Sequence, residues 1–231
     1  VDAAIGGKTG VNLVGGKNLV GAFHQPHAVL VDPTVLGTLP QREYVAGLYE
    51  VVKYGVIQTP WLFELLEEKR DGVLGRDPQA VDALIAESVR IKAEVVSADE
   101  RESGLRRILN FGHTVGHALE AETRYERFLH GEAVGFGMIA ATLLAEHIGL
   151  LDKVSSESVV ELVNDYGPIP SLAGVEAENL CGRLFQDKKT VQGKVHFVLP
   201  ESIGSVTVQS GIEPGAVLSA TKDALRRTRQ A

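Results

Sequence analysis

Apolar residues recur every three to four positions along most of the chain after residue 40, which is the period of a helix with one buried face. In residues 41–57, for example, Val45, Leu48 and Val52 fall on the same side. Three short apolar runs elsewhere predict strands instead. The pattern predicts helices over 41–57, 61–68, 78–98, 110–122, 132–151, 155–166, 176–185 and 213–229, and strands over 28–32, 195–200 and 205–208, the last two paired with each other.

The first 31 residues differ from the rest, because glycine-rich turns alternate there with short apolar runs that do not make a complete sheet. We therefore predict a mainly α protein in two parts. Residues 1–32 are expected to be the tail of an α/β domain, and residues 33–231 a multihelical domain. Because Val1 stands in a segment typical of the middle of a domain, we expect a fragment.

Composition narrows the class of protein without changing this picture. Hydrophobic residues make up 44% of the chain and charged residues 23%, as in ordinary globular proteins. The net charge of −7 argues against a nucleic-acid partner, which requires a basic face. Three glycines, Glu146 and His147 interrupt the most apolar stretch, 133–151, so we expect a buried helix there and no membrane span. The single cysteine, Cys181, excludes an internal disulfide and fits a cytoplasmic location.

Three histidines form the first candidate site. His113 and His117 are four residues apart, so a helix places them on one face, and His130 follows at the start of the next apolar segment. Imidazole is the commonest zinc ligand, and a catalytic zinc needs three protein ligands and one open position. The usual zinc-protease motif has Glu directly after its first His, whereas Thr114 stands here, which excludes that class. The spacing alone leaves open that one or both of the paired histidines are ordinary helix residues.

Glu50 and Lys53 form a second candidate feature, because both are charged residues within an apolar stretch. They stand three residues apart on a predicted helix, which places them on one face. The alternative is an exposed ion pair of little consequence, which the flanking Leu48, Val51 and Val52 make less attractive.

Scattered cations form a third feature. Lys8 and Lys17 each follow two glycines, a context in which backbone amides and an ammonium can hold a phosphate. The spacing of a nucleotide-binding P-loop is not met, because Asp2 stands where its first glycine would be. Lys92, Arg106, Lys188 and Lys189 are further candidates, although each alone could be a solvated surface charge.

Taken together, these runs resemble the 3-dehydroquinate synthase family of sugar-phosphate cyclases. The resemblance includes the segments Gly112-His113-Thr-Val-Gly-His117 and Leu129-His130-Gly-Glu132. It extends in the family's order over nearly the whole chain, through residues 1–12, 16–23, 25–26, 47–55, 91–93, 99–106, 109–120, 129–138 and 187–189. It implies the helical C-terminal domain of the dehydroquinate-synthase-like fold, preceded by the end of the N-terminal NAD-binding domain. The glycine-rich dinucleotide fingerprint of such a domain is not found in this sequence.

The resemblance also implies a role for each matching residue. The metal, zinc with cobalt as a possible substitute, would be held by Glu50, His113 and His130, while His117 would contact substrate and transfer protons. The catalytic group would be His117, Lys53, Glu102 and Asn110. Substrate would be bound by Lys8, Asn18, Lys92, Arg106 and one of Lys188 and Lys189. The NAD cofactor would lie near Asp2, Lys8, Lys17, Thr38 and Leu39.

The implied reaction converts 3-deoxy-D-arabino-heptulosonate 7-phosphate to 3-dehydroquinate and phosphate, in the shikimate pathway of aromatic amino-acid biosynthesis. It proceeds by transient oxidation by NAD, phosphate elimination, reduction and aldol closure, so the enzyme is a lyase. The implied partners are an anionic sugar phosphate and a second subunit of a homodimer. Open alternatives are another sugar-phosphate cyclase, a metal-dependent polyol or glycerol-phosphate dehydrogenase, and a non-catalytic helical fragment.

Overall fold

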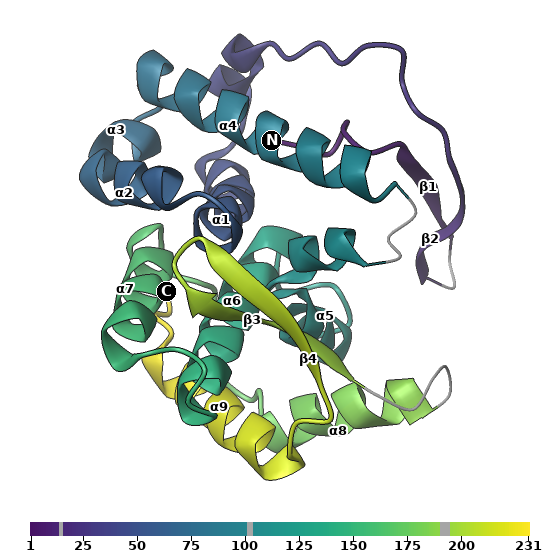
Figure 1. Ribbon diagram of the computed structural model, residues 1–231, viewed down its shortest axis with the longest axis vertical. Coiled ribbons are helices and arrows are strands. Elements are labelled where there is room, and N and C mark those ends of the chain that lie inside the picture. Colours follow the sequence, from purple (N-terminus) through teal and green to yellow (C-terminus); the bar gives the residue numbers. More distant parts are fainter. Residues whose placement is uncertain (14–15, 101–103, 190–194) are drawn as a thin grey trace.

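One buried helix, α6 (His130–His147), forms the centre of the molecule. The computed structural model describes residues 1–13, 16–100, 104–189 and 195–231, excepting the side chains of residues 12–13, 16–19 and 186–189. Residues Gly131 to Ala145 of α6 are all buried. Around it pack the helices α1 (Gln41–Ile57), α5 (His113–Glu122), α7 (Lys153–Asp165) and α9 (Pro214–Arg227) (Figure 1). Within the described part of the chain, no helix is long and apolar enough to cross a membrane.

The remaining elements cover the periphery. Two antiparallel hairpins stand at opposite ends of the sequence: β1 (Lys8–Leu13) pairs with β2 (Gly16–Phe23), and β3 (His196–Ser202) pairs with β4 (Ser205–Ser210). The second hairpin packs on α6 through β3, whereas the first lies beside the end of α4 (Figure 1). The other helical elements are η1 (Pro33–Thr38), α2 (Pro60–Glu68), α3 (Arg70–Leu74), α4 (Pro78–Ala98), η2 (Leu105–Asn110) and α8 (Ala177–Lys189).

The mainly helical class predicted from the sequence is confirmed. The predicted helices over 41–57 and 78–98 match α1 and α4, and the predicted C-terminal strand pair is β3–β4, with Val198 opposite Val208. The predicted helix over 110–122 begins only at His113, because Gly112 has a left-handed φ of +79° that a helix cannot continue.

The predicted strand over 28–32 is wrong, because these residues have no regular secondary structure. A strand requires a hydrogen-bonded neighbour, and the connection from β2 to η1 runs separately over the molecule (Figure 1). The β1–β2 hairpin, by contrast, was not predicted. Its glycine content hides the strand pattern, because glycine has a low strand preference.

Glycines allow the helices around the candidate site to approach each other unusually closely. A Cβ atom added to Gly131 of α6 would lie 1.8 Å from the carbonyl oxygen of Ala46 in α1. One added to Gly137 would lie 1.8 Å from the carbonyl oxygen of Gly112, which immediately precedes α5. Both distances are far below van der Waals contact, so only glycine fits. These two contacts hold α1 and α5 against α6.

Candidate metal and substrate site

Three helices bring a carboxylate and two imidazoles together at the start of α6. Glu50 lies in α1, while His113 and His130 are the first residues of α5 and α6. The Oε1 atom of Glu50 is 3.6 Å from Nε2 of His113 and 3.5 Å from Nε2 of His130. These are the three residues that the family resemblance assigns to the metal.

The separations within this trio fit a small divalent cation. Bonds of about 2.0–2.1 Å in a tetrahedral arrangement place ligand atoms roughly 3.3 Å apart. One potential ligand atom from each of the three residues lies within 4.8 Å of the others. A carboxylate and two imidazoles suit zinc and also cobalt, and three protein ligands leave a fourth position for a substrate oxygen.

The backbone before α5 orients the first of the two imidazoles. A metal-binding imidazole offers the lone pair of one nitrogen while its other nitrogen carries hydrogen. Nδ1 of His113 lies 3.1 Å from the carbonyl oxygen of Phe111, which can accept that hydrogen and leave Nε2 directed at Glu50. The left-handed turn at Gly112 brings this carbonyl and the His113 ring together.

Electrostatics distinguish the three side chains. Burial raises the pKa of the Glu50 carboxyl, but Lys53 and His130 outweigh burial and hold this pKa well below its usual value. Burial and the charge of Lys53 lower the pKa of His113 to about 4. Hydrogen bonds to Glu120 and Glu50 raise the pKa of His130 to about 9. The Glu50 carboxylate is therefore ionised, with the Lys53 ammonium beside it.

Lys53 belongs to the same cluster. Its ammonium lies 2.5 Å from Oε2 of Glu50, while Oε1 of the same carboxylate faces the two imidazoles. The side chain of Lys53 is only 4% exposed, which excludes the alternative of a surface ion pair. A buried ammonium next to the trio can stabilise negative charge on a bound ligand.

His117 lies one turn further along α5. The centre of its ring is 5.5 Å from that of His113 and 5.9 Å from that of His130, so the three imidazoles form a triangle. A second group with potential ligand atoms close together consists of His117, Glu120 and His130. The structure thus brings His117 to the edge of the candidate metal site and leaves its role open.

Asp2 joins the first residues of the chain to α1 and α4. Its carboxylate accepts a hydrogen bond from the Tyr54 hydroxyl and pairs with the Lys92 ammonium at 3.2 Å. Lys92 also donates to the carbonyl oxygen of Asp2 at 2.8 Å. Burial raises the pKa of Asp2, but Lys53, Lys92 and the Tyr54 hydroxyl outweigh burial and lower it. Asp2 is therefore an ionised carboxylate among cations.

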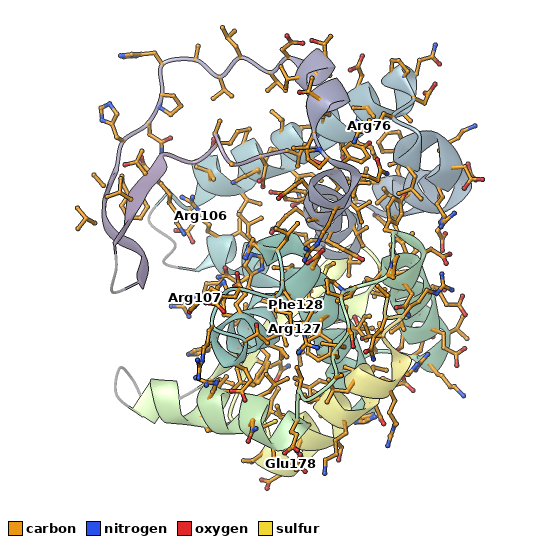
Figure 2. All side chains as sticks on the ribbon, turned by 180° about the vertical axis from the view of Figure 1, so that it is seen from behind. Arg76, Arg106, Arg107, Arg127, Phe128 and Glu178 are labelled. Carbon is orange, nitrogen blue, oxygen red and sulfur yellow. The ribbon has the colours of Figure 1, made fainter. Side chains whose placement is uncertain are left out.

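Arg106 connects the first residues of the chain to η2 in the same way. It is 3% exposed, and its guanidinium donates to the carbonyl oxygens of Glu100 at 2.8 Å and Gly6 at 3.2 Å. Figure 2 shows Arg106 beside the β1–β2 hairpin, at the end of α4. In this arrangement Arg106 holds the Gly6–Gly7 turn that leads to Lys8.

The other predicted site residues are placed less completely. Lys8 is exposed at the start of β1, and Asn110 ends η2 directly before the Phe111 turn. Thr38 is the last residue of η1 and Leu39 follows it, with its carbonyl oxygen accepting a hydrogen bond from Arg76. The side chains of Lys17, Asn18, Lys188 and Lys189, and the whole of Glu102, lie outside the described residues.

The structure adds three groups that sequence reasoning did not single out. Glu120 faces His130, the Phe111 carbonyl faces His113, and the Tyr54 hydroxyl faces Asp2. The spacing of Glu120 three residues after His117 was the only signal in the sequence, since it places the carboxylate near the histidine face of α5.

Comparison with sequence families gives two matches that together cover most of the chain. Residues 47–190 match the model described as 3-dehydroquinate synthase C-terminal, and residues 1–46 match that described as 3-dehydroquinate synthase N-terminal. The chain is 64% identical over 225 residues to the 3-dehydroquinate synthase of Solibacter usitatus and 53% identical over 223 residues to that of Koribacter versatilis. These alignments cover 97% and 96% of the chain but 63% and 61% of the relatives. The chain thus spans about three fifths of their length.

Solved structures of related cyclases share the fold. A 2-epi-5-epi-valiolone synthase from Streptomyces hygroscopicus, solved with NAD+ and Zn2+, superposes with a TM-score of 0.87 at 30% identity, covering 98% of this chain and 63% of that one. A 2-deoxy-scyllo-inosose synthase, solved with carbaglucose-6-phosphate, NAD+ and Co2+, gives a TM-score of 0.82 at 25% identity, with 96% and 62% covered. Both likenesses extend over nearly the whole of the present chain.

Proposed function

The chain belongs to the 3-dehydroquinate synthase family, and from that premise we propose that it acts in converting 3-deoxy-D-arabino-heptulosonate 7-phosphate to 3-dehydroquinate and phosphate. The observation that carries the proposal is the convergence of Glu50, His113 and His130 from three different helices. Such a trio is an open metal site, with room for a substrate oxygen beside the protein ligands. We propose zinc or cobalt as the metal and NAD as the second cofactor.

The cofactors would supply chemistry that side chains lack: NAD reversible hydride transfer, and the divalent metal Lewis acidity at a substrate oxygen. The residues of this chain bind and orient. Glu50, His113 and His130 would hold the metal, and the buried Lys53 ammonium adds positive charge on the Glu50 side. Preorganised charge of this kind stabilises an alkoxide or enolate as it develops on the substrate.

Proton transfer falls to His117 in this proposal. Its imidazole lies at the edge of the metal trio, with its ring centre 5.5 Å from that of His113, and its residue is exposed. An imidazole can both accept and donate a proton, which is why histidine is the commonest general acid and base. His117 would assist loss of the phosphate group, with Asn110 and Glu102 as further polar groups.

The cations at the other end of the site favour a substrate with two anionic groups. Three cations lie at the first residues of the chain: Lys92 pairs with Asp2, Arg106 donates to the Gly6 carbonyl oxygen, and Lys8 begins β1. A carboxylate and a phosphate on one small molecule need separated cations, which fix its orientation as well as its affinity. We propose that these residues, together with Asn18 and Lys188 or Lys189, bind the heptulosonate. NAD would lie near Asp2, Lys17, Thr38 and Leu39.

Phosphate release tests the proposal directly. The purified protein is incubated with heptulosonate 7-phosphate, NAD and zinc, beside a His113→Ala variant and beside glucose 6-phosphate as an alternative substrate. We expect release from the heptulosonate that is lost in the variant, because removal of one of three ligands disrupts the metal site. NADH should not accumulate, since the hydride is returned in each turnover.

Each other outcome contradicts a specific part of the proposal. Release that survives His113→Ala would refute the metal assignment. Preference for glucose 6-phosphate would point to a different cyclase, and net NADH formation to a polyol or glycerol-phosphate dehydrogenase. No release under these conditions would refute activity of this chain by itself.

A homodimer in the cytoplasm, without nucleic-acid or membrane partners, is the finer part of the proposal. Light scattering after size-exclusion chromatography would measure the molecular mass, and a value near that of the 24.8 kDa chain would contradict the dimer.

A further inference from the structure

The most informative group outside the predicted site is the carboxylate of Glu120. It lies in α5, is 3% exposed, and its Oε2 atom is 3.5 Å from Nδ1 of His130. The other ring nitrogen of His130, Nε2, is 3.5 Å from Glu50. The imidazole therefore stands between two carboxylates, one on each nitrogen.

The two histidines of the metal trio are held from behind by different acceptors. Nδ1 of His113 faces the Phe111 carbonyl oxygen at 3.1 Å, whereas Nδ1 of His130 faces Glu120. In both residues it is Nε2 that faces Glu50. An acceptor at Nδ1 selects the tautomer whose lone pair is on Nε2. A carboxylate acceptor also increases the basicity of the ring, so that Nε2 binds a metal more strongly.

The side chain of His130 needs such support more than that of His113 does. The His130 side chain is 46% exposed, against 15% for His113, so packing restrains its ring less. Glu120, by contrast, is a buried residue of α5, and α5 packs on α6. A rigid acceptor on one helix therefore fixes an exposed ring at the start of the next.

We propose that Glu120 is the positioning residue that orients His130 toward the metal and thereby increases the affinity of the site for the metal. This inference rests on the metal centre described under the proposed function. It differs from the alternative that Glu120, His117 and His130 ligate a second ion, for which the same atoms are also close enough. As a positioning residue, Glu120 acts through His130, and one ion is bound per chain.

Zinc affinity and stoichiometry, measured by competition with a chromogenic chelator, test this role without reference to activity. Glu120→Gln keeps the shape and a carbonyl acceptor but removes the charge, while Glu120→Ala removes the acceptor. We expect about tenfold weaker binding for Gln and up to about 100-fold weaker binding for Ala, each with one zinc per chain. The absorption spectrum of the cobalt-loaded protein should change, because the geometry of the His130 ligand changes.

Glu122→Gln is the matched control, since this glutamate lies two residues further along α5 and pairs instead with Arg183. It should leave affinity and spectrum unaltered. Circular dichroism of the zinc-free proteins shows whether each variant folds. If Glu120→Ala does not fold, the comparison of Glu120→Gln with the unaltered protein still tests the role of Glu120.

Affinities of both Glu120 variants within twofold of the unaltered protein would overturn the role of Glu120 while leaving the metal centre intact. Two zinc ions per chain, reduced to one by either variant, would overturn it in favour of a ligand role. Absence of zinc binding by the unaltered protein would overturn the metal centre itself and, with it, this inference.

Discussion

The helices around α6 and the first 32 residues of the chain are organised in contrasting ways. Glu50, His113 and His130 stand on helices whose backbones touch at glycines, within one continuous apolar core. The first residues are joined to the helices by polar contacts at Asp2 and Arg106. The β1–β2 hairpin in this region has three exposed apolar side chains, those of Val11, Val20 and Phe23.

This difference separates two kinds of site residue. The positions of the metal trio follow from close packing, which tolerates little displacement. The positions of Lys8 and the Gly6–Gly7 turn follow from a few hydrogen bonds and ion pairs, each of which is worth about 1–3 kcal/mol at most. We therefore expect changes in the helical region to have large effects on the metal site. Changes in the N-terminal contacts should have small effects that do not reach it.

Gly137→Ala is the change with the largest expected effect. Its methyl group would meet the Gly112 carbonyl oxygen, so α5 must move away from α6 and carry His113 with it. We expect the free energy of unfolding to fall by about 3 kcal/mol, as for overpacked cores, and zinc affinity to fall as well. Urea denaturation and chelator competition measure the two effects.

Gly182→Ala is the matched control for this prediction. Gly182 is also helical, in α8, but a Cβ atom there meets nothing within 4 Å. Alanine should raise the free energy of unfolding by about 0.5–1 kcal/mol, because it lowers the entropy of the unfolded chain. Equal effects of the two substitutions would show that close approach of α5 and α6 does not maintain the site.

Tyr54→Phe tests the other region with a smaller expected effect. The Tyr54 hydroxyl donates to the carboxylate of Asp2, and burial together with Asp2 raises the pKa of Tyr54, so this hydroxyl stays protonated. Its removal should cost about 1.5 kcal/mol, the lower end of the range for a hydrogen bond to a charged group, because Lys92 still pairs with Asp2.

Amide hydrogen exchange should locate that loss in residues 1–13, with little change in α6 and zinc affinity within twofold. Loss of zinc binding in Tyr54→Phe would refute the separation between the two regions. Because the variant keeps the aromatic ring, it changes the hydrogen bond to Asp2 without changing the packing of the ring in the core.

The same separation explains what could be predicted from the sequence. Helices with a clear apolar face, such as α1 and α4, were predicted with their bounds, because burial of that face determines them. The family resemblance supplied the trio of Glu50, His113 and His130. Spacing alone favoured His113 with His117, because sequence periodicity describes one helix at a time.

The remaining features depend on contacts between segments far apart in the sequence. Glu50 meets His130 because Gly131 lets α6 reach Ala46, and no local pattern specifies that approach. The run over 28–32 has the composition of a strand but no ladder partner among the described residues, and composition cannot supply one. Glu120 was overlooked for the same reason, since its importance comes from a residue on the next helix.

Acidification should reveal the smallest effect, through Asp2. Its pKa in the folded protein is lowered from the ordinary value of 3.8, because Lys53, Lys92 and the Tyr54 hydroxyl outweigh the effect of burial. A carboxyl group with a lowered folded pKa contributes stability above its unfolded pKa, and this contribution disappears as pH falls through the folded value. The contacts of residues 1–13 should therefore weaken below about pH 4, by less than about 1–2 kcal/mol.

Hydrogen exchange at about pH 6 and pH 3, corrected for the intrinsic pH dependence of exchange, measures the free energy of local opening. In the unaltered protein we expect this free energy to fall with pH for residues 1–13. In Asp2→Asn it should already be low at pH 6 and change little, because the amide does not titrate. A decrease of the same size in both proteins would assign the pH dependence to other groups. The ionised Asp2 would then not be what holds the N-terminal segment to α1 and α4.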